Sequence, residues 1–402
     1  MDNRSPGATG RRDLWLLLSV RSIRAVGFGF SAILLGLYLQ DRKLPPIQIG
    51  IVIAVGLASA SLTGLAAANA QRAFGRRRTL AAAGILMAAC GIILAFGTQF
   101  WLFVLAGITG MLGASGTDTG PFLSVEQAVL ADATTPAGRN RAFARYSTTG
   151  ALAGAAGGLL ASFGGDAPRI QALFVLYAGI GIITALMPLM LSSKIEGAPE
   201  APVFGNLRPL IGLSALFAID SFGGGLVARS LIAYWLHLKF GATPAILGPT
   251  FAAMLLLGAL CYELAGRLAD RIGLINTMVF THLPSNLMLL LLPFLPGLWW
   301  AIGLLIIWSA AQSMDVPARQ AYVVSIVKPN ERSGAVAITG VARGLASAAG
   351  PAITGAAIQT AALGTPFIVA GITKALYDIA LYYGFRRRRG DHEISPTGYD
   401  RH

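Results

Sequence analysis

Long apolar segments fill nearly the whole chain and are separated by short polar turns. Each segment is long enough to cross a bilayer as an α-helix, which takes roughly 20 residues. We place twelve such segments, at residues 14–39, 47–71, 79–97, 101–130, 141–163, 170–191, 209–238, 245–266, 274–293, 298–326, 334–361 and 366–385. Within lipid, only helices or closed barrels satisfy every backbone polar group. The pattern therefore predicts an all-α membrane protein with twelve transmembrane helices.

The composition agrees with this prediction. Of the 402 residues, 55% are hydrophobic and only 12% are charged, about half of the roughly 25% that is usual in soluble domains. The chain has 49 glycines, and small residues allow membrane helices to approach closely. Cys90 and Cys261 both fall within apolar segments, so no disulfide framework is implied.

The net charge of +13 would suit a nucleic-acid partner, but the basic residues follow the loops instead. If the N-terminus lies inside, the arginines at 76–78 and 386–389 are all cytoplasmic. The outer turns then hold only Arg42, Lys43, Arg169 and Lys239. This asymmetry predicts a multi-pass protein of the cell (inner) membrane with both termini in the cytoplasm and no nucleic-acid partner.

The two halves of the chain are related by an offset of about 196 residues, which indicates an internal repeat. The matched positions are Arg24 with Asp220, Gly27 with Gly223, Gly29 with Gly225, Trp101 with Trp299, Glu126 with Arg319, Pro136 with Pro329, and Gly157 with Gly350. We therefore expect two pseudo-symmetric six-helix bundles at 14–191 and 209–385. A cytoplasmic tail at 1–13, a Pro-rich linker at 192–208 and a basic tail at 386–402 complete the organisation.

A charged turn joins the eighth and ninth segments, with the sequence Gly266-Arg-Leu-Ala-Asp270-Arg271-Ile-Gly273. It resembles the signature loop of the major facilitator superfamily of transporters, whose members also contain two six-helix halves. The resemblance covers about residues 14–385. It implies that helices 1, 4, 7 and 10 line a central cavity, that 2, 5, 8 and 11 form the rocking interface, and that 3, 6, 9 and 12 face lipid. It also implies a monomer.

The two turns depart from the family pattern in complementary ways. The second-half turn lacks a trailing basic pair and continues with Leu274 and Ile275. The first-half turn has three arginines at 76–78, but Gln71 or Arg72 stands in the place of the acid.

The resemblance therefore assigns a gating role to Asp270 and Arg271 alone, with Asp270 facing Arg139 and Arg141 at the start of the fifth helix. Glu263 lies three residues before the turn and belongs to the same network. The alternative is a solvated turn that only sets the topology.

Charges inside the membrane are the main functional signal, because each costs at least about 2.5–3.5 kcal/mol. All four helices that the resemblance places around the cavity carry some, and they predict a substrate and coupling site. These residues are Arg21, Arg24, Asp118, Asp220, Arg229, Asp315 and Arg319.

Two pairs of repeat-equivalent residues carry opposite charges. Arg24 and Asp220 are expected to pair across the cavity until Asp220 is protonated or substrate binds; the alternative is a permanent structural pair. Glu126 and Arg319 are expected to form a bridge at the cytoplasmic gate; the alternative is two separate surface charges.

Proton coupling is predicted at Asp118 or Asp220. Asp118 and Asp315 lie close to prolines, where a bent helix admits water. The alternative for Asp315 is a local pair with Arg319, four residues further on. Arg343 is expected to reach the cavity or a gate.

Lys374 and Asp378 are also four residues apart, in the twelfth segment. This spacing predicts mutual neutralisation and a structural role.

Enzymatic chemistry is not predicted. The chain has no Walker loop, and its cysteines and histidines (His237, His282, His392 and His402) have no metal-ligand spacing. No cofactor or metal is therefore expected.

The function that we expect is secondary transport of a small polar or amphiphilic solute, coupled to protons and directed outward. The fifth helix has glycines at 154, 157 and 158 but lacks the proline of the export motif; Pro351 occupies the equivalent place in the eleventh. An alternative is an uptake permease for an organic anion, which would use Arg21, Arg24, Arg229 and Arg343. An alternative from another class is a non-transporting receptor or scaffold on the same fold.

Overall fold

The computed structural model describes residues 8–116, 120–132, 134, 136–196, 208–327 and 332–385, and all regular secondary structure in these residues is helical. The first half contains α1 (Ala8–Asp41), α2 (Pro46–Phe74), α3 (Arg76–Phe96), α4 (Phe100–Ile108), α5 (Pro121–Asp132), α6 (Pro136–Ala161) and α7 (Ala167–Leu186). The second contains α8 (Arg208–Leu226), α9 (Arg229–Phe240), α10 (Pro244–Ile272), α11 (Leu274–Leu291), α12 (Leu298–Ser313), α13 (Asp315–Ser325), α14 (Arg332–Gln359) and α15 (Thr365–Phe385). Short 3₁₀ turns lie at Met187–Met190, Ser193–Ile195 and Leu292–Phe294.

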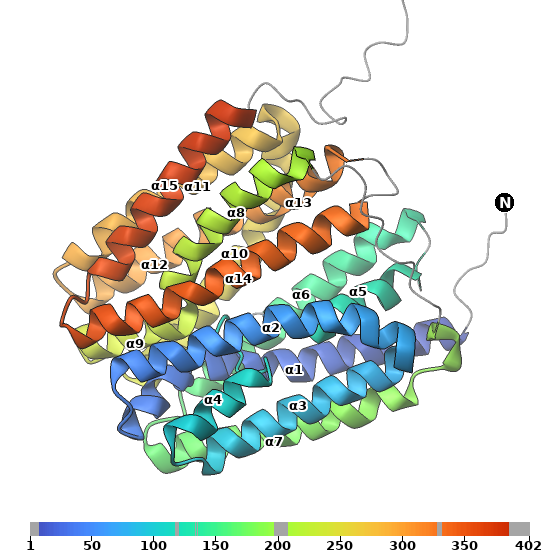
Figure 1. Cartoon of the computed structure of the whole chain (residues 1–402), viewed down its shortest axis with the longest axis horizontal. Helices are drawn as coiled ribbons and strands as arrows, with labels where there is room; N and C mark the ends of the chain where they lie inside the picture. The colour runs from blue at the N-terminus through green and yellow to red at the C-terminus, as the bar shows by residue number, and fades with distance from the viewer. Residues whose placement is uncertain are drawn as a thin grey trace, which may run out of the picture.

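The helices run roughly along one direction, and their ends define two faces of the molecule (Figure 1). We call the face where α1 begins and α15 ends the terminal face, and the other end the opposite face. Over the described residues, eight spans are long and apolar enough to cross a membrane.

Three of the predicted transmembrane segments are each divided into two helices, so the prediction of one continuous helix is corrected for these segments. The fourth segment is divided into α4 and α5 by a stretch in which glycines at 110, 113, 116 and 120 adopt positive φ. A helix cannot continue through such residues. The seventh is interrupted between α8 and α9, after three consecutive glycines. The tenth is interrupted at Met314, because Pro317 lacks the N–H that would bond to the carbonyl of Ser313.

Equivalent glycines bring α1 against α6 in the first half and α8 against α14 in the second. A Cβ on Gly29 would lie 2.2 Å from the carbonyl oxygen of Gly154, and one on Gly225 would lie 1.9 Å from that of Ser347. These two crossings occupy repeat-related positions. They require that the helix backbones touch, which is how small residues stabilise helix pairs in lipid.

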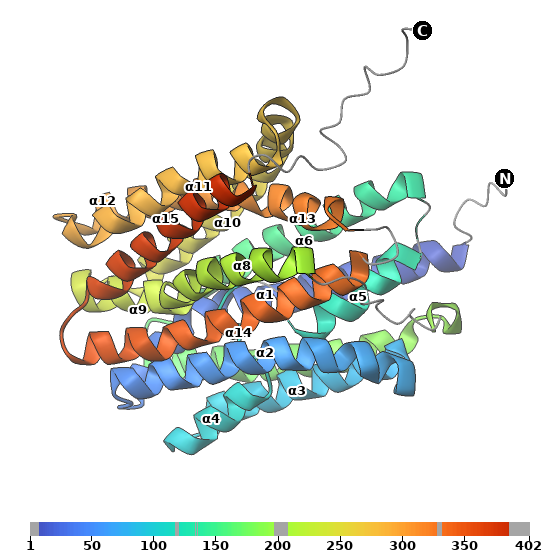
Figure 2. The same ribbon diagram turned by 45° about the horizontal axis from the view of Figure 1, so that its top comes forward.

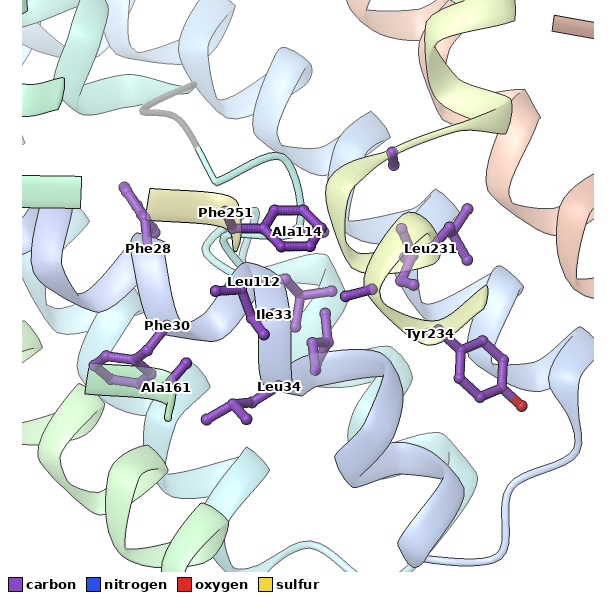
Figure 3. Packing of buried hydrophobic residues seen from close by; sticks show 14 of the residues in the cluster. Phe28, Phe30, Ile33, Leu34, Leu112, Ala114, Ala161, Leu231, Tyr234 and Phe251 are labelled. Atoms are coloured by element: carbon purple, nitrogen blue, oxygen red, sulfur yellow. The ribbon is translucent and has the colours of Figure 1, made fainter. Parts of the chain in front are cut away.

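The largest hydrophobic core extends through the first half, and the second half joins it at the opposite face, where Leu231 and Phe367 lie. Figure 3 shows its centre, to which Phe28, Ile33 and Leu34 of α1 and Leu231 and Tyr234 of α9 all belong. At the terminal face the cores are separate. One lies within the second half, around Phe217 and Tyr322, and a smaller one lies within the first half, around Leu130 and Tyr146.

The interface helices follow the same pattern. Helices α2 and α14 lie side by side near the opposite face and diverge toward the terminal face (Figures 1 and 2). The backbones touch at Gly50, where a Cβ would lie 2.3 Å from the carbonyl oxygen of Pro351. The halves are therefore joined at the opposite face.

We predict that Gly225→Ala lowers the melting temperature of the purified protein in detergent, because the new methyl group forces α8 away from α14. Overpacking of this kind costs about 1–3 kcal/mol. The matched control is Gly224→Ala, where the added Cβ meets nothing within 4 Å. Equal melting temperatures for the two variants would contradict the backbone contact.

Candidate functional site

A buried ion pair joins the first and fourth helices of the first half. The guanidinium of Arg24 on α1 donates to both carboxylate oxygens of Glu126 on α5, at 2.8 and 2.7 Å. Tyr146 on α6 donates to the same carboxylate at 2.6 Å. Both charged side chains are fully buried, at 0% exposure. The Arg24 guanidinium also lies 4.0 Å from the centre of the Phe122 ring, an arrangement that favours a cation.

A larger buried network surrounds Asp220 in the second half. Lys374 on α15 donates to its carboxylate at 2.5 Å, and Arg319 on α13 lies 3.4 Å away. Arg319 also donates to Asp315 at 2.6 Å. The Nε2 atom of His282 on α11 is 3.6 Å from Asp220. One carboxylate thus meets cationic or titratable groups from three other helices.

The network continues between α11 and α15. His282 Nδ1 lies 3.0 Å from Asp378, and Asn286 donates to the same carboxylate at 2.7 Å. On the other side of Asp220, Arg343 of α14 donates to Ser221 at 3.0 Å. A set of polar groups therefore crosses the second bundle from α14 to α15.

The two networks occupy repeat-equivalent positions with inverted polarity. Arg24 and Asp220 are equivalent under the repeat, and so are Glu126 and Arg319. In the first half the cation is on the first helix and the acid on the fourth; in the second half the acid is on the seventh helix and the cation on the tenth. Each half therefore contains a bridge between corresponding helices.

In this conformation Arg24 does not pair with Asp220, and Glu126 does not meet Arg319, a bridge that the sequence predicts for a closed cytoplasmic gate. Equivalent positions lie at the same depth, but they belong to different bundles, whereas the first and fourth helices of one bundle are neighbours. The charges therefore pair within each half. For Asp315, the local pair with Arg319, which was the alternative interpretation, is the one that forms.

The predicted pair of Lys374 with Asp378 is also wrong. Both residues are buried on α15, but Lys374 reaches Asp220 on α8, while Asp378 meets His282 and Asn286 on α11. Spacing along one helix indicates a shared face, and here that face packs against two other charged helices.

The remaining predicted cavity residues lie near these networks or near the helix breaks. The Arg21 guanidinium is 4.6 Å from the centre of the Tyr146 ring. Arg229 begins α9, and its buried Nη1 atom has no hydrogen-bond partner within the described ranges. A Cβ on Gly116 would lie 3.1 Å from this atom. Asp118 lies outside the described residues.

The two signature turns have the same backbone geometry. Gly75 joins α2 to α3 with φ 85°, and Gly273 joins α10 to α11 with φ 86°. Glu263 lies 3.4 Å from Arg267, and both are exposed at the terminal face. Asp270 and Arg271 are exposed there as well. The side chains of Arg139 and Arg141 are not among those described.

The carboxylate that the first turn lacks in sequence comes from the linker. Glu196 accepts hydrogen bonds from the backbone N–H groups of Arg76 at 2.6 Å and Arg77 at 3.3 Å. It thus caps α3, where an acid is favoured by the unpaired N–H groups. Nearby, Asp13 of α1 accepts a bond from the backbone N–H of Ser192 at 3.0 Å.

The sequence alone did not identify Tyr146, His282 and Asn286 as members of the two networks, nor Glu196 as the cap of the first turn. A signal for two of them was present. His282 and Asn286 are four residues apart in an apolar helix, and Lys374 and Asp378 have the same spacing in another. Two polar pairs on helices predicted to face lipid each need partners, and here Asp378 meets His282 and Asn286 while Lys374 meets Asp220.

Comparison with known proteins places the chain in a family. The sequence profile of the Major Facilitator Superfamily matches residues 17–227 and 213–399. An uncharacterized membrane protein of Saccharomyces cerevisiae is 22% identical, with 92% of this chain and 93% of that protein covered. A class G tetracycline resistance protein of Vibrio anguillarum is 27% identical, with 69% of this chain and 72% of that protein covered.

Solved transporter structures share the fold. A point mutant of the nucleoside transporter NupG superposes with a TM-score of 0.74 at 14% identity, covering 92% of this chain and 100% of that one. A bacterial homologue of the lysosomal transporter Spinster, inward-facing and occupied, also gives 0.74 at 15% identity, covering 95% and 97%. A D-xylose–proton symporter gives 0.72 at 17% identity, covering 92% and 97%. With the profile match over nearly the whole chain, these results show that the chain belongs to the Major Facilitator Superfamily of transporters and has its twelve-helix, two-bundle fold.

Proposed function

We propose that this transporter exports a small polar or amphiphilic solute across the inner membrane of a bacterial cell in exchange for protons. The observation that carries the proposal is the titratable network around Asp220, which contacts Lys374, Arg319 and His282 inside the second bundle. Intramembrane ionisable groups are costly and mark proton and substrate pathways. The network links four helices, so a change of protonation within it acts on their relative positions.

The packing of the halves supports an alternating-access mechanism. The shared core at the opposite face and the separate cores at the terminal face correspond to closure on one side only. The positive-inside asymmetry assigns the terminal face to the cytoplasm. We infer that this is the inward-facing state, and that Asp270, Arg271 and Glu263 act when the terminal face closes.

The similarity to a tetracycline resistance protein supports outward transport of an amphiphilic solute. The similarity in fold to a proton symporter is compatible with proton coupling. A scaffold without transport activity is disfavoured, because it would bear the cost of burying charges without using them.

Uptake of an organic anion is a second candidate, favoured by Arg229. Its Nη1 atom is buried without a hydrogen-bond partner among the described residues, beside the break between α8 and α9. A buried guanidinium with an unused donor is suited to bind a carboxylate or phosphate.

We expect cells of an efflux-deficient bacterium that express the protein to accumulate less ethidium or tetracycline than control cells. A protonophore should abolish the difference, and so should Asp220→Asn, because Lys374 and Arg319 lose their shared carboxylate. The control is Asp41→Asn, at the exposed end of α1, with expression measured for each variant. Unchanged accumulation with well-expressed wild-type protein would overturn the export proposal.

The two candidates differ in their dependence on Arg229. If the protein is an exporter of cationic dyes, we expect Arg229→Gln to leave ethidium export largely intact. If the protein is an anion permease, cells that express the wild-type protein should take up radiolabelled organic anions. The Arg229→Gln variant should lose this uptake. The test compares both probes in the same strain, and anion uptake abolished only by Arg229→Gln would favour the second candidate.

A further inference from the structure

We propose that His282 is the proton-binding site of the second bundle, and that its imidazole bridges Asp220 and Asp378 when it carries a proton. The inference rests on the proposed proton coupling and goes beyond it, because it moves the proton site from the carboxylates of the central helices to a histidine on α11. This helix is the ninth transmembrane segment, which the family layout assigns to the lipid-facing side.

Both ring nitrogens of His282 face carboxylates. Nδ1 lies 3.0 and 3.2 Å from the two oxygens of Asp378, and Nε2 lies 3.6 Å from Asp220. A neutral imidazole has one N–H donor and one acceptor, so one nitrogen would direct its lone pair toward carboxylate oxygen. The protonated ring has two donors: Nδ1–H can donate to Asp378, and Nε2–H faces Asp220 at 3.6 Å, which is an electrostatic contact beyond hydrogen-bond distance. Asn286 Nδ2 also lies 3.2 Å from Nδ1, but this amide donates to Asp378 at 2.7 Å, so the geometry matches the protonated form.

The charge balance is compatible with the same result. The ion-paired cluster contains the acids Asp220, Asp315 and Asp378 and the permanent cations Arg319 and Lys374. Among these ion-paired groups, three negative and two positive charges leave one negative charge, which either a proton on His282 or the nearby Arg343, held at Ser221, can balance. Histidine is the residue whose ordinary titration lies near neutral pH, so it is suited to take up and release this proton.

The charged and polar side chains around His282 determine how the cluster responds when the imidazole loses its proton. Tyr377 and Asp378 face it from α15, Asp220 from α8 and Asn286 from its own helix, and Lys374 of α15 pairs with the same Asp220. Arg319 and Asp315 lie beyond Asp220 on α13.

The one nearby cation on an interface helix is Arg343, among the residues that the structure describes. It donates to Ser221, next to Asp220, from α14. When His282 loses its proton, the cluster gains a net negative charge, which attracts Arg343. The adjacent Gly344 packs against Ser61 of α2 in the other half. Deprotonation is thereby linked to the contact between the two bundles.

The first test measures the protonation of His282 directly. A variant with His237→Gln, His392→Gln and His402→Gln leaves His282 as the sole histidine, so the residue under study is not altered. In protein labelled with ¹⁵N-histidine in detergent micelles, the ring nitrogens report the protonated and neutral forms. We expect a reversible change between these forms from pH 5 to 9. Adding Asp378→Asn should increase the neutral fraction at a given pH.

Two spectroscopic results would overturn the inference. One is a neutral ring throughout the range, and the other is a protonated ring that never releases its proton, which would indicate a permanent structural bridge. A titration that Asp378→Asn leaves unchanged would also refute the bridging role.

The second test measures coupling in proteoliposomes with radiolabelled tetracycline. We expect His282→Gln to retain exchange of tetracycline between the two sides but to lose accumulation driven by a pH gradient. The control is His237→Gln, a residue whose Nδ1 faces the backbone carbonyl of Ala242. Gradient-driven accumulation retained in His282→Gln would overturn the inference while the proposed function stands. No gradient-driven transport by wild-type protein, with a titrating His282, would refute the proposed function alone.

Discussion

A charge buried among membrane helices is costly unless an opposite charge lies beside it, and this cost determines how the ion pairs of each bundle are arranged. Removing one partner of a buried pair costs about 3–5 kcal/mol, because the other is left uncompensated. Arg24 and Glu126 meet this requirement between α1 and α5, and Asp220 and Arg319 meet it between α8 and α13. The bridges hold α5 and α13, the second parts of the broken fourth and tenth helices, to α1 and α8 of their own half.

The inverted polarity of the two bridges has a consequence for mechanism. A bridge needs only opposite charges, so a duplicated unit can exchange acid and base without losing it. The first half keeps a compact pair with Tyr146, whereas the second half extends its acid to Lys374 and His282. Among the described residues, only the second bundle extends its bridge to further ionisable side chains in this way. The two halves are therefore alike in packing but differ in the chemistry available to them.

Much of the fold could be predicted from the sequence, because apolar length and loop charge act locally. The segment ends agree with the helices within several residues, and the repeat identified the equivalent glycines that later proved to be helix crossings. The breaks were missed because an apolar run with glycines at 110, 113 and 116 has the same hydropathy whether or not it is helical.

The pairing of the charges could not be predicted in the same way. The repeat correctly identified Arg24, Asp220, Glu126 and Arg319 as equivalent pairs, but it is silent about which neighbour each side chain faces. That depends on helix rotation, which a single sequence does not determine. Lys374 and Asp378 are the clearest example. Their spacing predicts that they share one face of α15, but it does not predict that this face contacts α8 and α11.

The most direct test of this account is charge reversal within and between the halves, read as the yield and melting temperature of folded protein in detergent. Arg24→Glu places two carboxylates side by side and should destabilise the first bundle. The account predicts that adding Glu126→Arg restores much of the loss, as coupled neighbours do, and that adding Asp220→Arg instead does not. Rescue by Asp220→Arg, or strictly additive losses for Arg24→Glu and Glu126→Arg, would contradict pairing within each half.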